Sequence, residues 1–144
     1  MDVALSRNRG FTLIEVMVVV VILGILAAFI VPKIIGRPDE AKVAKVKSDV
    51  QALQTAMDLY RLDNGRYPST EQGLRALVEK PSSDPIPSGW RTGGYIQKLN
   101  DDPWGRAYLY TNPGEHGEID IFSYGAEGQP GGEGINSTIG NWSN

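Results

Sequence analysis

The segment "RGFTLIEVMVVVVILG", residues 9–24, places a single glutamate near the start of a long apolar run. From Phe11 to Val31 only Thr12 and Glu15 are polar. The length of this run is close to the ~20 residues that an α-helix needs to cross a bilayer. The pattern predicts a membrane-spanning helix, and it raises the question of what compensates the charge of Glu15.

Two other interpretations of the apolar run remain open, a cleaved secretory signal and a buried core helix. A secretory signal has an apolar core of about 7–15 residues followed by a small-x-small cleavage site, and this run is longer. Arg7 and Arg9 precede the run. By the positive-inside rule they place the N-terminus in the cytoplasm.

Composition excludes several classes of function. The chain has 144 residues, 14 basic and 17 acidic, with a formal net charge of -3, so it lacks the broad basic field that attracts nucleic acids. It contains no cysteine, which removes disulfides, thiolate zinc sites and thiol nucleophiles. His116 is the only histidine, and no nucleophile–base pair or catalytic carboxylate motif is visible. We therefore expect neither nucleic-acid binding nor catalysis.

The charge of Glu15 points to assembly. A carboxylate within the hydrocarbon layer costs about 2.5–3.5 kcal/mol on insertion scales and usually has a partner. The span itself contains no cationic residue. A cut between Gly10 and Phe11 would create an α-amine on Phe11, which could pair with Glu15 of an adjacent copy. Glu15 would then direct polymerisation.

The residues "RGFTLIE" resemble the class III signal of type IV pilins and of type II secretion pseudopilins. Further stretches resemble the major pseudopilins of the type II secretion system, and together they cover nearly the whole chain. These stretches are "LDNGRYPSTEQGL" (62–74), "DPWGRAYLY" (102–110), "NPGEHG" (112–117) and "GNW" (140–142).

The resemblance implies that a membrane peptidase cleaves between Gly10 and Phe11 and methylates the new N-terminus. It divides the chain into a leader (1–10), a membrane and filament-core helix (11–35) and a periplasmic domain (36–144). The subunit would wait in the bacterial inner membrane, then polymerise into a periplasmic pseudopilus that drives export of folded proteins across the outer membrane. Its implied partners are other copies of itself, minor pseudopilins, an inner-membrane assembly platform and the prepilin peptidase.

The remaining pattern predicts an α+β fold, with the long N-terminal helix packed on a small C-terminal antiparallel sheet. Pro32 and Pro38 should loosen the helix, which we expect to resume at Asp39. An apolar stripe with helical spacing follows and should pack on the sheet, with a coiled coil as the alternative. The stripe consists of Val43, Val46, Val50, Leu53, Met57 and Tyr60. Asn64 and Gly65 should end the helix.

The shorter elements follow from turn and capping signals. Ser69 or Thr70 can cap a second short helix that ends before Pro81. Residues 106–111 and 118–125 read as a hairpin around "NPGEHG". In the second strand Ile119, Ile121 and Ser123 alternate with Asp120, Phe122 and Tyr124. Trp90 is expected to cover the core, and His116 to make a surface hydrogen bond.

In the tail "SYGAEGQPGGEGINSTIGNW" (123–142), the only side chains that could hold a cation bear oxygen, and oxygen ligands suit a hard cation. The resemblance implies a calcium ion held by the carbonyl of Tyr124 and the side chains of Glu127, Asn136 and Thr138. The family usually has aspartates at the last three positions, and fewer charged ligands lower calcium affinity. A loop ordered without metal, by hydrogen bonds and the packing of Ile139, is the alternative.

Three other assignments stay open beside the major pseudopilin. A type IV pilin shares the leader but typically carries a C-terminal disulfide loop, which a chain without cysteine cannot form. A minor pseudopilin is closer, although "DPWG" and "YPSTEQGL" favour the major one. A membrane-anchored binding domain that never polymerises would leave Glu15 without a purpose.

Overall fold

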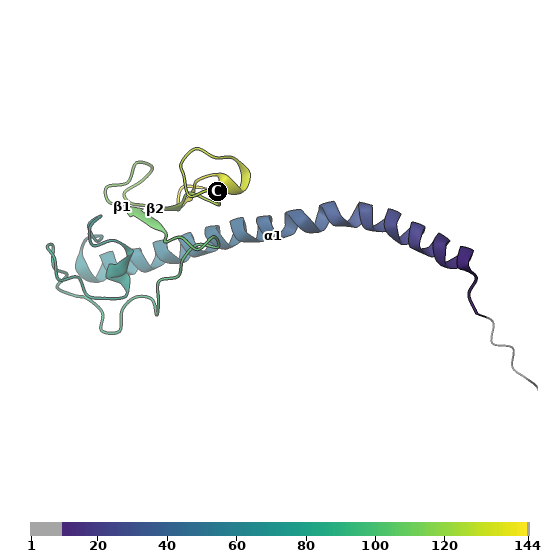
Figure 1. The fold of residues 1–144 in the computed structure, drawn as a ribbon. Coiled ribbons are helices and arrows are strands. Elements are labelled where there is room, and N and C mark those ends of the chain that lie inside the picture. The colour runs from purple at the N-terminus through teal and green to yellow at the C-terminus, as the bar shows by residue number, and fades with distance from the viewer. Residues whose placement is uncertain (1–9, 144) are drawn as a thin grey trace, which may run out of the picture. The chain divides into compact units, whose positions relative to one another are not determined.

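The structure is a computed structural model that describes residues 10–143, apart from the side chains of residues 29–37. The chain divides into two units, Met1–Pro38 and Asp39–Asn144. The elements are labelled in Figure 1 and follow in chain order: α1 (Leu13–Asn64), the 3-10 helix η1 (Leu74–Leu77), β1 (Leu109–Thr111), β2 (Asp120–Ser123), the 3-10 helix η2 (Gly134–Asn136) and β3 (Ile139–Gly140). The leader through residue 9 lies outside the described residues.

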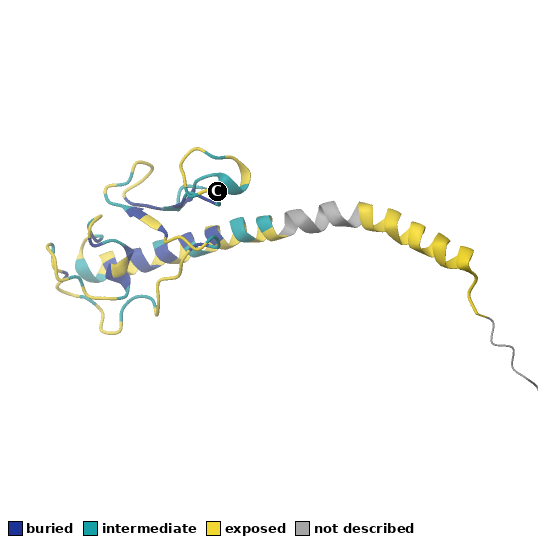
Figure 2. Ribbon diagram, viewed as in Figure 1, coloured by how far each residue is buried: buried dark blue, intermediate teal, exposed yellow. Residues whose placement is uncertain are grey.

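The first part of α1 is apolar and exposed, as the yellow ribbon of residues 13–28 shows in Figure 2. Within the residues that the structure describes, no helix combines the length and the apolar character required to cross a membrane. The span expected over residues 11–35 runs into residues 29–37, whose side chains lie outside the description. The loosening expected before Asp39 is absent, because α1 is helical without a break from Leu13 to Asn64. The fixed φ of proline is compatible with a helix, although Pro32 and Pro38 each remove one backbone hydrogen bond.

The second part of α1 carries the predicted apolar stripe into the core. Five of its six members are buried, and Val43 packs partly against them. The buried members are Val46, Val50, Leu53, Met57 and Tyr60. The helix ends at Asn64 as predicted, since Gly65 takes a φ of 78° and its N–H donates to the Arg61 carbonyl at 2.7 Å. A left-handed glycine in this position is a frequent way of closing a helix.

The segment after α1 is fixed by a reciprocal cap. The Ser69 hydroxyl accepts from the Gln72 N–H at 3.2 Å, and the Gln72 side chain accepts from the Ser69 N–H at 3.0 Å. The expected second helix is only η1, because Gly73 has a φ of 62° and breaks the turn before it; its N-cap is Gly73, not Ser69 or Thr70 as predicted. Trp90 covers the core as predicted, and its indole N–H donates to the Ala76 carbonyl at 2.8 Å.

The sheet has three antiparallel strands in the order β1-β2-β3. The predicted hairpin is confirmed, with Tyr110 opposite Ile121, but both strands are shorter than expected and β3 was not predicted. Ile119, Ile121 and Ser123 are buried as the alternation predicted, but Asp120, expected on the opposite face, is buried as well because its carboxylate accepts hydrogen bonds from the β1–β2 connection. Their apolar members join the α1 stripe in one core, which confirms the α+β fold of a long helix packed on a small sheet.

β1 is short because the chain before it forms a turn around a buried carboxylate. One oxygen of Asp102 accepts from the N–H groups of Trp104 and Arg106 at 3.0 and 2.9 Å, and the other accepts from the Ser123 hydroxyl at 2.7 Å. Backbone groups used in this turn cannot join the β ladder. Just beyond it, the Tyr108 hydroxyl donates to Asp49 at 2.7 Å; burial, and then this carboxylate, raise the pKa of Tyr108.

Candidate functional site

The residues proposed for processing lie just before α1. Phe11 is 88% exposed and Gly10 is also exposed. A β-carbon at Gly10 would meet no described atom within 4 Å. The described fold therefore does not require glycine here, so the reason for this residue must be sought in an interaction with another molecule.

Glu15 forms a reciprocal cap with Thr12 at the start of α1. The Thr12 N–H donates to the Glu15 carboxylate at 3.1 Å, and the Thr12 hydroxyl accepts from the Glu15 N–H at 3.3 Å. This is the capping box of helix N-termini. This cap was not predicted, although a threonine three residues before a glutamate at the start of an apolar run is its signature.

The position of Glu15 at the helix N-terminus partly compensates its charge. The carboxylate lies at the positive end of the helix dipole, which stabilises an anion there. Among residues 10–143, apart from the side chains outside the description, no cationic group forms an ion pair with it. Glu15 thus has a neutral partner within its own chain, while its charge stays open to a cation from another copy.

The helix that follows presents a continuous apolar surface. The large apolar side chains from Leu13 to Leu26 are between 49% and 80% exposed. Monomeric soluble proteins rarely expose apolar patches of this extent, and such patches mark sites of contact with membranes or proteins. The N-terminal unit can therefore bury itself in lipid or against other helices.

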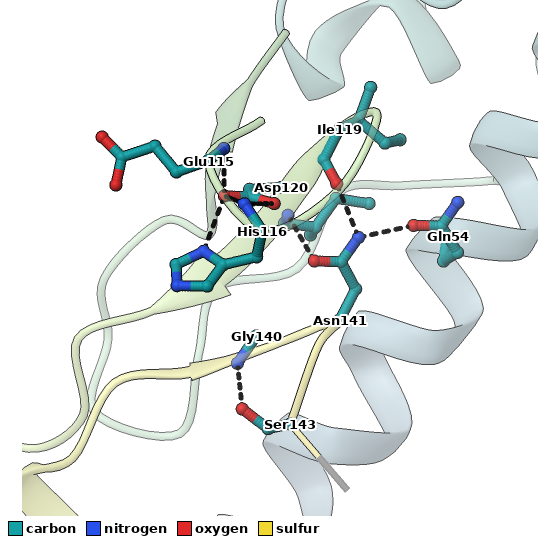
Figure 3. A network of polar contacts seen from close by, with 9 residues as sticks. Gln54, Glu115, His116, Ile119, Asp120, Gly140, Asn141 and Ser143 are labelled. Atoms are coloured by element: carbon teal, nitrogen blue, oxygen red, sulfur yellow. Dashed lines mark hydrogen bonds and ion pairs between the residues drawn. The ribbon is translucent and has the colours of Figure 1, made fainter. Parts of the chain in front are cut away.

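A second polar site ties the last strand to the rest of the C-terminal unit (Figure 3). The Asn141 side chain accepts from the Ile121 N–H at 3.2 Å and donates to Gln54 of α1 at 2.7 Å and to the Ile119 carbonyl at 2.9 Å. One amide thus joins α1, the entry to β2 and the end of β3. In the sequence Asn141 stands within "GNW", and no local pattern there predicts these contacts.

We expect Asn141→Ala to lower the free energy of unfolding by about 2–3 kcal/mol, because it leaves several partly buried polar groups without partners. The measurement is a thermal melt of the full chain in detergent micelles, followed by near-ultraviolet circular dichroism. Asn100→Ala is the matched control, since Asn100 is exposed. An equal Tm for Asn141→Ala and wild type would contradict the role given to this amide.

Asp120 organises the connection between β1 and β2. It is only 3% exposed, and it accepts from the Glu115 N–H at 2.8 Å and from the ring of His116 at 2.9 Å. Burial by itself would raise the pKa of Asp120, but the hydrogen bonds from His116 and from the backbone outweigh it and lower that pKa. His116 makes the surface hydrogen bond that was predicted, with Asp120 as its partner.

The "GNW" motif packs against this connection. The Trp142 ring stacks on His116, with centroids 3.7 Å apart and planes 7° from parallel. A β-carbon at Gly140 would collide with the same tryptophan ring. The glycine is therefore needed to admit Trp142, and Asn141 between them holds the strand in place.

Two of the four residues expected to hold calcium are in direct contact with each other. Asn136 donates from its amide nitrogen to the Glu127 carboxylate at 3.0 Å. Tyr124 and Thr138 line a hollow of about 490 Å³ together with His116, Trp142 and other residues, a lining that includes neither Glu127 nor Asn136. In the part of the chain that the structure describes, no group of three or more histidine, aspartate or glutamate side chains could hold a metal ion.

Two protein-family models together match nearly the whole chain. Residues 33–142 match the family model described as type II secretion system (T2SS), protein G. Residues 5–31 match the model of the prokaryotic N-terminal methylation motif, and this range includes Gly10, Phe11 and Glu15.

Individual relatives agree with the family models. The type II secretion system core protein G of Pseudomonas aeruginosa is 56% identical over 138 residues, covering 96% of this chain and 97% of the relative. That of Vibrio cholerae is 54% identical, covering 96% and 94%. The crystal structure of the major pseudopilin from enterohaemorrhagic Escherichia coli matches with a TM-score of 0.67 and 53% identity, over 75% of this chain and 92% of that one. The chain therefore belongs to the type II secretion system protein G family, the major pseudopilins, as the sequence resemblance indicated.

Proposed function

We propose that this protein is a structural subunit of the type II secretion pseudopilus, which polymerises through its N-terminal helix and drives export of folded proteins across the outer membrane. The observation that carries the proposal is the exposed apolar helix, with one carboxylate at its start, joined to a folded C-terminal unit. Two relatives more than 50% identical over nearly the whole chain are both named type II secretion system core protein G. The role is structural, and it needs no catalytic group.

The N-terminal residues have a part in each stage of this cycle. The prepilin peptidase would cut between Gly10 and Phe11 and methylate Phe11, in keeping with the methylation motif matched there. The subunit would wait in the inner membrane as a single-pass protein, with its C-terminal domain in the periplasm. On entry into the filament, the Phe11 amine of one copy would pair with Glu15 of its neighbour.

Assembly changes the surroundings of the apolar surface of α1. The exposed apolar side chains of residues 13–26 would be covered by lipid before assembly and by other copies in the filament. Minor pseudopilins and an inner-membrane assembly platform would start and feed growth. This order of partners accounts for the exposed apolar side chains of residues 13–26.

The experiment that tests the function is deletion of the gene in its own host. We expect exported proteins to accumulate in the periplasm, and plasmid-borne wild-type chain to restore their release. Overproduction should also yield filaments in the sheared surface fraction that contain this chain. Undiminished release from the deletion strain would overturn the assignment.

A further inference from the structure

The C-terminal loop, residues 124–138, offers a poor set of ligands for calcium. Calcium takes about 6–8 oxygen ligands, and carboxylates dominate its tight sites. Of the expected side chains only Glu127 is charged, and it accepts a hydrogen bond from the Asn136 nitrogen, so that this amide turns its N–H toward the carboxylate. Among the described residues no buried side-chain oxygen lacks a partner. This donor set does not match a calcium site.

A cation of the chain itself reaches the start of the loop. The Arg106 guanidinium donates to the Ala126 carbonyl at 2.8 Å and to the Gly125 carbonyl at 3.4 Å. A β-carbon at Gly128, whose φ is 68°, would collide with this guanidinium. The side chain therefore lies against the loop over Gly125, Ala126 and Gly128.

The backbone of Arg106 is fixed by the buried turn around Asp102. The Asp102 carboxylate accepts from the Arg106 N–H, and the Asp102 N–H donates to the Arg106 carbonyl at 2.7 Å. The same carboxylate accepts from the Ser123 hydroxyl, which in turn accepts from the Gly125 N–H at 3.1 Å. The Arg106 backbone and, through Ser123, the start of the loop are thus both hydrogen-bonded to the Asp102 carboxylate.

The loop also closes on itself through its backbone. The Ala126 N–H donates to the Ile135 carbonyl at 2.8 Å, next to the Asn136–Glu127 contact. A β-carbon at Gly125 would collide with the Ile135 and Ser137 carbonyls, so the two sides of the loop are in close contact. The carbonyls that Arg106 contacts, those of Gly125 and Ala126, thus lie next to the hydrogen bond that closes the loop.

We infer that Arg106 orders the C-terminal loop by taking the place of a metal ion, and that the folded subunit does not depend on calcium. A guanidinium brings a permanent positive charge and several donors in a fixed plane, so it can hold adjacent carbonyls together. The inference concerns the loop and does not require the chain to polymerise.

The test compares thermal melts of the full chain in detergent micelles, with calcium chloride or with EDTA. Wild type should show the same Tm in both. Arg106→Ala should lower the Tm by about 5 °C, since hydrogen bonds from a charged donor are lost, and limited proteolysis should then cut within residues 124–138. Arg75→Ala is the matched control, because the Arg75 side chain is exposed and pairs with the exposed Glu79.

Each outcome decides the inference. Arg106→Lys should recover part of the lost Tm, because lysine keeps the charge but lacks the planar fork. If Arg106→Ala fails to fold, this lysine variant and the calcium response of wild type still provide the test. A rise in the wild-type Tm with calcium, or an Arg106→Ala chain as stable and as protease-resistant as wild type, would overturn the inference.

Discussion

Replacing Glu15 by leucine should leave the chain in the membrane but reduce filament yield by about 100-fold or more, because removing one partner of a desolvated ion pair costs about 3–5 kcal/mol. Helix α1 should still form, since leucine is a good helix former. The measurement is the amount of this chain in sheared filaments relative to the membrane fraction, at equal total expression.

Glu15→Gln separates the charge of this residue from its role in the helix cap. Glutamine can still accept from the Thr12 N–H, as in other capping boxes, but it cannot pair with the Phe11 amine. Its filament yield should fall nearly as far as that of Glu15→Leu. Glu40→Gln is the control, because it removes a charge from an exposed position of the same helix. A wild-type filament yield from Glu15→Gln would show that the cap suffices for polymerisation and that the charge is not needed.

Gly10→Leu should block processing almost completely. A bulky side chain at the cleavage position hinders the approach of a protease that glycine permits, while the described fold itself has room for a β-carbon there. Intact mass of the protein from host membranes is the measurement. Wild type should begin at Phe11 and carry one methyl group, and Gly10→Leu should have the mass of the whole 144-residue chain.

Gly24→Ala is the matched control for this change. A β-carbon at Gly24 would also meet no described atom within 4 Å, so the substitution alters a glycine of the same segment without touching the cleavage position. It should be processed like wild type. Normal processing of Gly10→Leu would refute the peptidase assignment, and a wild-type mass of the uncleaved chain would leave Glu15 without its proposed partner.

The elements that local rules determine could be predicted from the sequence. The stripe from Val46 to Tyr60 and the helix end at Asn64 depend on residues within a few positions of each other. Their spacing and capping chemistry are visible in a linear chain. The hairpin followed from alternation on either side of a turn-rich segment.

The parts that were missed depend on contacts between distant residues. Nothing near Asn141 reveals that its amide reaches Gln54, and nothing near Asp102 reveals that it accepts from Ser123. β3 has only two residues, and it is a strand only because β2 lies beside it. The exception is the Thr12–Glu15 cap, which was local and could have been found.

The Asn141–Gln54 hydrogen bond has a consequence for the order in which the chain folds. It joins residues 87 positions apart, and the Tyr108–Asp49 bond joins residues 59 apart. Contacts between distant residues form late, since the entropy of closing a long loop must be overcome first. The α1 stripe can become helical early, but its core is completed only when β3 docks and adds Ile139. A nascent subunit thus leaves part of its apolar core open to solvent until residues 139–142 arrive, and a chaperone would be of most use in this interval.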